Sequence, residues 1–159
     1  MHAGGDTMLR FVMAVVLLLP ALAWAGDQDS IGYVKTVKGG AFVIDGGKPV
    51  RAAPGTPIRM GNTLKTGPDG SMGVTFKDNT VMSFGPDTAL TVDEYLYAPG
   101  NDNLKFGTTV SKGSLQVVSG VIARLKPNSV RMKTPTGTIG IRGTRYLVRV
   151  EPQNGGEKP

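Results

Sequence analysis

Few side chains in this chain are suited to catalysis. It contains one histidine, His2, and no cysteine. His2 precedes the apolar N-terminal segment, so the rest of the chain excludes Ser-His-Asp and Cys-His catalysis, as well as His/Cys sites for zinc or copper. Adjacent strand residues point to opposite faces, so we expect that Asp93 and Glu94 do not form a carboxylate pair. We therefore expect no enzyme activity and no cofactor.

Charge is distributed unevenly along the sequence. The net charge is +6. The segment 78–102 holds five acidic residues and no basic ones, whereas 103–150 holds nine basic residues and no acidic ones. Such an asymmetry favours an anionic partner. The alternative is that the two regions lie side by side in the fold and partly neutralise each other.

The basic residues near the C-terminus are the best candidates for an interaction face. A strand over Arg145–Val150 would alternate basic with apolar side chains, and a strand over Val130–Thr134 would carry bases on its outward face. Phosphate-rich glycolipid, peptidoglycan carboxylates and an acidic protein surface all suit such a face. A solvated strand face, with Arg142 bonding loop carbonyls, is the alternative. The candidate residues are Arg131, Lys133, Arg142, Arg145 and Arg149.

The run Thr134–Thr144 (TPTGTIGIRGT) is rich in glycine and threonine. A phosphate-binding loop needs glycines that open onto a helix, usually with a lysine, whereas a β-branched strand follows here. We expect the glycines at 137, 140 and 143 to serve close strand packing, with Gly143 at a bend or bulge. Ile139 and Ile141 are expected on one face of a short strand.

The segment 31–150 predicts an all-β domain of about ten short antiparallel strands, because turn signals recur every few residues. Met72, Val74, Phe76, Met82 and Phe84 alternate along two of these strands and are core candidates, as are Leu90 and Val92. Two strands are expected around 111–113, and the helical leaning is confined to Gly120–Leu125. Pairs of Gly-Ser at 70–71 and 113–114 favour stacked, solenoid-like turns, with a sandwich as the alternative.

The N-terminus has the features of a secretory signal peptide. Arg10 precedes an unbroken apolar run over Phe11–Leu19, and Ala23-Trp24-Ala25 matches the small-x-small cleavage pattern. The apolar run is shorter than the ~20 residues that span a bilayer. We expect cleavage after Ala25, a start at Met8, and a periplasmic or secreted product that is neither lipid-anchored nor inserted in a membrane. Residues 26–30 form a leader, and 151–159 a disordered tail.

Four segments together resemble the FecR domain family of bacterial envelope proteins. The glycine-rich run matches that family's TPTATIGIRGT signature, and the upstream matches are Gly61–Thr66, Gly70–Phe84 and Ser111–Ser119, in the same order. The resemblance covers 31–150 and implies a twisted, solenoid-like β domain. It assigns structural motif positions to Gly137, Gly140, Arg142, Gly143 and Thr144.

The resemblance also implies a role. Similar regulators relay the state of an outer-membrane receptor to a sigma factor, but this chain shows no anti-sigma region and no receptor-docking domain, so we expect a free-standing FecR domain. The first hypothesis is a non-catalytic module that binds an envelope protein in signalling or assembly. The second is a binder of lipopolysaccharide or peptidoglycan. Nucleic acid is not an expected partner, because secretion separates the two and aromatic residues are few.

Overall fold

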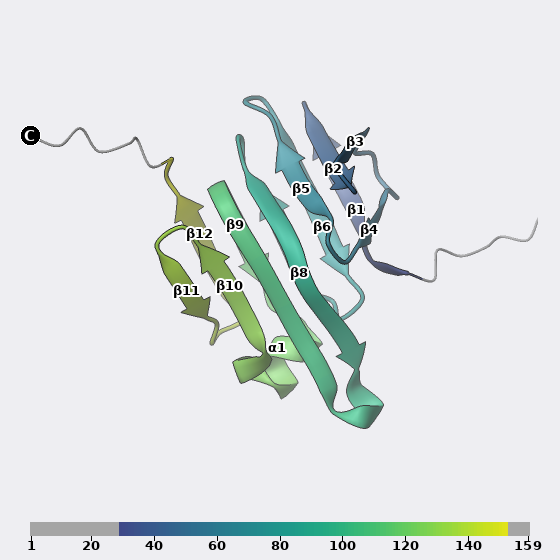
Figure 1. The fold of residues 1–159 in the computed structure, drawn as a ribbon, viewed down its shortest axis with the longest axis vertical. Coiled ribbons are helices and arrows are strands. Elements are labelled where there is room, and N and C mark those ends of the chain that lie inside the picture. Colours follow the sequence, from purple (N-terminus) through teal and green to yellow (C-terminus); the bar gives the residue numbers. More distant parts are fainter. Residues whose placement is uncertain (1–28, 153–159) are drawn as a thin grey trace, which may run out of the picture.

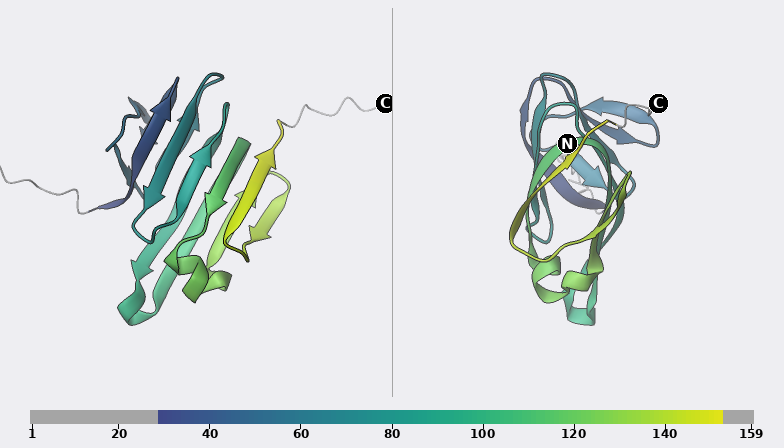
Figure 2. Two further views of the ribbon diagram at one scale, coloured as in Figure 1. Left: turned by 180° about the vertical axis from the view of Figure 1, so that it is seen from behind. Right: turned by 90° about the vertical axis from the view of Figure 1, so that its left-hand side faces the viewer.

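A computed structural model describes residues 29–152, and the expected signal peptide, its cleavage site at Ala25 and residues 153–159 lie outside them. The described residues form one continuous, mainly antiparallel twelve-stranded sheet. Figure 1 shows the strands side by side, and the end-on view in Figure 2 shows the sheet curling back on itself into two facing layers. The all-β expectation is confirmed as this curled half-barrel.

The two layers share one strand. Layer A contains β1 (Ser30–Lys38), β4 (Pro57–Arg59), β6 (Ser71–Phe76), β7 (Val81–Phe84) and β12 (Arg145–Val150). Layer B contains β2 (Ala41–Asp45), β3 (Lys48–Arg51), β5 (Thr63–Thr66), β8 (Ala89–Ala98), β10 (Val130–Thr134) and β11 (Gly137–Gly140). The shared strand is β9 (Asn103–Val118), which pairs with β8 and β10 in layer B and with β7 and β12 in layer A.

The strand β9 folds over at Gly113 and so belongs to both layers. The buried positions of β9 are even-numbered from Leu104 to Val110 and odd-numbered from Leu115 to Val117. This change of phase coincides with a positive φ of 93° at Gly113, a conformation that glycine adopts without a steric penalty. The two strands expected around 111–113 are therefore one strand that turns from one layer into the other.

A stack of such crossings closes one end of the molecule, the upper end in Figure 1. We call this stack the turn ridge; it comprises 39–40, 66–70, 85–88 and 112–114. Adjacent crossings bond through their backbones, since Gly67 N donates to Gly40 O at 2.9 Å and Asp87 N donates to Gly67 O at 3.0 Å. Both Gly-Ser pairs lie here, each where the chain enters layer A. The stacked, coil-like turns are thus present at this end.

Buried threonines tie the turn ridge together from inside. Thr66 Oγ1 donates to Gly85 O at 2.7 Å and accepts from Thr88 N at 3.0 Å. Thr88 Oγ1 donates to Ser114 O and accepts from Ser114 N, both at 3.0 Å. A buried hydroxyl is tolerated when both its donor and acceptor functions are used, as they are at these two positions.

The core lies between the layers and is apolar. Every predicted core residue of β6, β7 and β8 is buried, which confirms the alternation over 71–92. Phe76 packs edge-on against Phe106 with ring centroids 4.9 Å apart, and Tyr95 lies beside both rings. The short helix α1 (Val121–Leu125) covers the end opposite the turn ridge with Ile122 fully buried.

In the described part of the chain, helical structure is limited to single turns. The segment Gly120–Leu125, expected to be helical, contains α1. Two 3-10 turns are also present: η1 (Pro99–Asn101) precedes β9, and η2 (Pro127–Ser129) precedes β10. Within residues 29–152, no helix is long and apolar enough to cross a membrane.

Candidate functional site

The five candidate bases do not share one face. Arg131 and Lys133 are exposed on β10, so they point outward from layer B. Arg145 and Arg149 are exposed on β12, so they point outward from layer A. Arg142 is exposed in the loop between β11 and β12. Because the layers face each other across the core, their outer faces point in opposite directions, and the predicted single basic face is wrong.

The outer face of layer B carries both signs of charge. Arg131 and Glu94 flank Gly107 in register, one from β10 and one from β8, which places their backbones about 10 Å apart at ordinary strand spacing. Lys133 flanks Thr109 on the same side, and Asp93 accepts a hydrogen bond from Thr109 Oγ1 at 2.6 Å. At β10 the acidic and basic regions are therefore neighbours, which favours the neutralising alternative for Arg131 and Lys133.

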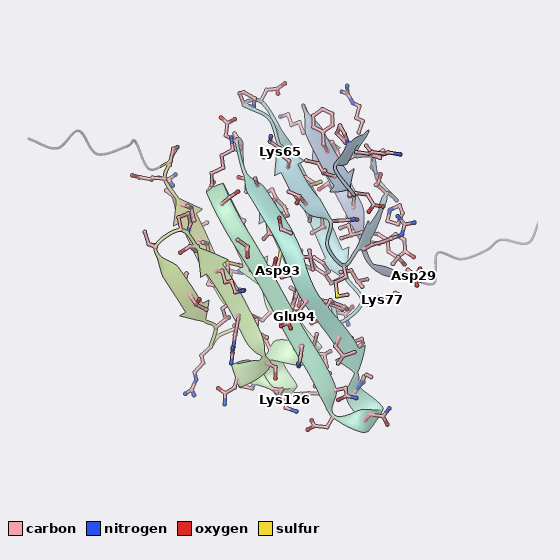
Figure 3. All side chains as sticks on the ribbon, viewed as in Figure 1. Asp29, Lys65, Lys77, Asp93, Glu94 and Lys126 are labelled. Atoms are coloured by element: carbon pink, nitrogen blue, oxygen red, sulfur yellow. The ribbon has the colours of Figure 1, made fainter. Side chains whose placement is uncertain are left out.

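The expectation that Asp93 and Glu94 point to opposite faces is also wrong. The register of β8 against β9 shifts between Val92 and Glu94, which marks a bulge. Val92 and Tyr95 both turn toward the core, and the two carboxylates between them are both exposed. Figure 3 labels both side chains on β8.

The outer face of layer A has the opposite character. The strands β1, β4, β6, β7 and β12, and residues 113–118 of β9, contain no Asp or Glu. Around Gln116 this face consists of small hydroxyl side chains and glycine, with Ser83 opposite Gln116 and Gly73 opposite Ser83. Arg145, Leu147 and Arg149 border it on β12. The basic region thus meets no acidic strand on this side.

β12 places an apolar side chain between its two arginines. Leu147 is 72% exposed, the largest exposed fraction among the large apolar side chains of residues 29–152. On the opposite side of the strand, Val148 is buried and Tyr146 is half-buried. Burial raises the pKa of the Tyr146 hydroxyl above its ordinary value. The inner side of β12 therefore anchors it to the core, and the outer side leaves Leu147 in solvent.

The loop between β11 and β12, residues 141–144, is called the motif loop and faces α1 across an open hollow of roughly 500 Å³. Arg124 of α1 and Arg142 both line it, together with Gly143 and Thr144, and no acidic side chain does. Ser119 holds the loop in place, because its Oγ donates to Gly143 O and its N donates to Thr144 O, both at 2.8 Å. Sequence reasoning missed Arg124, because only the fold brings α1 beside this loop.

The glycines of the motif have different roles from those expected. A Cβ at Gly137, Gly140 or Gly143 would meet nothing within 4 Å, so the expectation of close strand packing is wrong. Gly143 has a φ of 138°, which fits the expected bend. Ile139 and Ile141 do not share a face either: Ile139 is 43% exposed, whereas Ile141 follows the end of β11 and is buried.

A buried carboxylate that sequence reasoning placed only in a turn links three segments. Asp78 is fully buried and accepts hydrogen bonds from Thr80 Oγ1 at 2.7 Å and from Tyr95 OH at 3.2 Å. Its Oδ2 accepts from Ile122 N at 3.4 Å, and its backbone carbonyl accepts from Val121 N at 2.7 Å. Desolvation and the adjacent Asp78 carboxylate raise the pKa of the Tyr95 hydroxyl. Asp78 therefore holds the N-terminus of α1 against the sheet through these hydrogen bonds.

Comparison with known proteins identifies the domain type. The model of the FecR family, described as FecR protein, matches residues 62–156, which is more than half of the chain. No curated protein and no solved structure matches this chain. The match includes the motif loop, the strand β12 and the folded-over β9. The chain therefore belongs to the FecR family.

Proposed function

We propose that this protein is a non-catalytic module that binds another protein of the bacterial envelope and acts in signalling or assembly. Membership of the FecR family supports a signalling-related module. The observation that carries the proposal is the acid-free outer face of layer A, bordered by Arg145, Leu147 and Arg149. Exposed arginine next to exposed leucine suits a protein surface, because arginine is enriched at interfaces and apolar area drives association.

Two further observations favour a binding role over catalysis. The buried polar side chains Asp78, Thr66 and Thr88 already bond to backbone groups that hold turns and α1 in place. The charged groups outside the core are spread over both outer faces. The signal-peptide pattern over Phe11–Ala25 supports a periplasmic or secreted location.

A binder of anionic envelope polymer is the second candidate. The hollow lined by Arg124 and Arg142 favours it, because two guanidinium groups beside an acid-free cavity suit phosphate or carboxylate. Binding of this kind is expected to weaken steeply as salt rises.

Incubating the purified mature protein, residues 26–159, with two envelope fractions distinguishes the candidates. One fraction is outer membrane bearing its proteins, and the other is protein-free peptidoglycan or lipopolysaccharide. We expect retention on the membranes, and loss of retention after the membranes are treated with protease. Retention on the protein-free polymers that falls with salt would establish the second candidate instead.

Matched variants locate the binding face. Arg145→Glu with Arg149→Glu reverses the charge bordering layer A, and Arg131→Glu with Lys133→Glu makes the same change on the mixed face of layer B. We expect the first pair to reduce retention at least tenfold and the second pair to reduce it less than twofold. Equal loss in both pairs would show that net charge, not this face, controls binding.

A further inference from the structure

β12 is an edge strand, paired with β9 on one side and with no other strand of the described region. It is six residues long, which is an ordinary strand length. An exposed strand edge presents unpaired N–H and C=O groups and is a ready template for another strand. β11 is also at an edge, but it is shorter and has glycine at both ends.

The register shows which backbone groups of β12 are free. Residues of an antiparallel pair alternate between bonding to the partner and pointing away from it. Ser119 N donates to Thr144 O at 2.8 Å, so Thr144 bonds toward β9. By alternation Tyr146, Val148 and Val150 also bond toward β9. The N–H and C=O groups of Arg145, Leu147 and Arg149 therefore point to the free edge of β12.

The other side of β9 agrees with this assignment. Gly85 N donates to Ser114 O at 2.8 Å, so Ser114 bonds toward β7. Gln116 and Val118 then bond toward β7 as well, which leaves Leu115 and Val117 for Val148 and Tyr146 of β12.

The same residues carry the exposed side chains. Arg145, Leu147 and Arg149 offer both free backbone groups and outward side chains in a basic-apolar-basic order. Neither arginine is within 4 Å of a carboxylate in the described region. Asp87 and Glu151 line a hollow with Arg149 at the turn ridge.

We propose that β12 receives an extended acidic segment of another protein as an additional strand of layer A. Residues directly opposite in an antiparallel pair share a face, with Cβ atoms about 5 Å apart. An acidic residue opposite each arginine and an apolar residue opposite Leu147 give the order acid-x-apolar-x-acid. The x residues turn inward beside Tyr146 and Val148, so apolar side chains suit them. Backbone bonds then supply the affinity and the two acids the specificity.

This inference rests on the proposed function, because it names the partner's chemistry at the same face. The test uses the mature protein and an end-blocked peptide, Thr-Glu-Val-Val-Val-Glu-Thr. We expect saturating peptide to slow amide hydrogen exchange at Arg145, Leu147 and Arg149 at least tenfold. Raising the salt from 50 to 300 mM should weaken binding several-fold.

Two control peptides separate the parts of the proposal. Replacing both Glu residues by Lys should abolish binding, because like charges then face each other. Methylating alternate backbone nitrogens on the bonding edge should abolish it without changing the side chains. Binding of the methylated peptide with undiminished affinity would overturn strand addition, and absence of slowed exchange with the acidic peptide would overturn the site.

A matched pair of variants tests the edge within the protein. Leu147→Pro removes an N–H that points to the free edge, which an edge strand tolerates. Val148→Pro removes one that bonds to β9. We expect the Leu147 variant to keep the circular dichroism of the parent and bind the peptide at least tenfold more weakly, and the Val148 variant to lose stability. An Arg145→Glu variant that keeps full affinity would overturn the charge assignment.

Other occupants give different results. If β12 instead joins a second copy, the protein dimerises without peptide and Leu147→Pro makes it monomeric, which overturns the acidic partner. If the peptide fails while protease-sensitive retention on membranes persists, the partner docks elsewhere and only this inference fails. If both fail, the proposed function fails with it.

Discussion

At the residue scale, Asp78 connects three segments, because it bonds to its own turn, to β8 and to α1. Asp78→Ala leaves the Thr80 and Tyr95 hydroxyls and two buried N–H groups without their carboxylate acceptor. We expect a loss of about 3 kcal/mol in the free energy of unfolding, measured by urea denaturation. Asp93→Ala is the control, since its carboxylate is exposed and bonds only to Thr109 among the described contacts; a similar loss there would contradict the role of Asp78.

Two tyrosines predict how stability depends on alkaline pH. The folded state raises the pKa of Tyr95 and Tyr146 above the value of about 10 in the unfolded chain. The unfolded chain therefore releases these protons first. The contribution of the two protonated hydroxyls to the stability of the folded state is fully present below about pH 10. Above that pH the free energy of unfolding falls by up to ~1.4 kcal/mol per pH unit for each tyrosine.

Urea denaturation between pH 8 and pH 11 measures this loss. Tyr95→Phe with Tyr146→Phe should flatten the decline above pH 10, even though Tyr95→Phe also removes the bonds to Asp78 and lowers stability at neutral pH. An unchanged slope in the double variant would show that other groups, such as the lysines, set the alkaline limit.

At the element scale, the fold-over of β9 depends on Gly113. A Cβ there would lie 2.4 Å from Thr88 Cα and 2.7 Å from Asp87 O, in addition to the strain of a φ of 93°. Gly113→Ala should lower the free energy of unfolding by more than about 3 kcal/mol or prevent folding.

The chain offers a matched control for that substitution. Gly55 has a φ of 92° and open space around it. Gly55→Ala should therefore cost only the backbone strain of about 1–2 kcal/mol. Equal losses at the two positions, in urea denaturation, would mean that contact with the neighbouring crossing does not matter.

The sequence predicts strands well where buried and exposed side chains alternate along them without interruption. The stripes of β6 and β7 follow from period-two alternation, so their core residues are correct. The misses occur where an extra residue changes the phase. The bulge at Asp93 and the fold-over at Gly113 are both set by cross-strand contacts, which no local pattern encodes.

At the scale of the whole molecule, sequence reasoning failed on the basic face because it located each strand but not its layer. Arg131 and Arg145 lie on strands that both pair with β9, yet on its two halves, so they point in opposite directions. The hollow lined by Arg124 and Arg142 could not be predicted from the sequence for the same reason. The alternative that the acidic and basic regions are neighbours holds on layer B, where β8 and β10 flank β9.

The central position of β9 predicts a gradient of local stability. β9 has paired neighbours on both sides in both layers, whereas β3 and β11 each have one. Amide hydrogen exchange should be slowest in β9 and fastest in β3 and β11. Uniform exchange across the strands would show that the molecule opens only as a unit.

The turn ridge gives the two ends of the molecule different tolerance to engineering. Glycines at 39, 70 and 113 lie against the backbone of the next crossing, so an inserted residue there displaces its neighbours in turn. The hairpin between β2 and β3 is more open, because a Cβ added at Gly46 or at Gly47 would meet no other atom within 4 Å. A fluorescent label or an affinity tag therefore belongs in that hairpin, far in the strand order from β12, where it reports on the protein without occupying the edge that we assign to its partner.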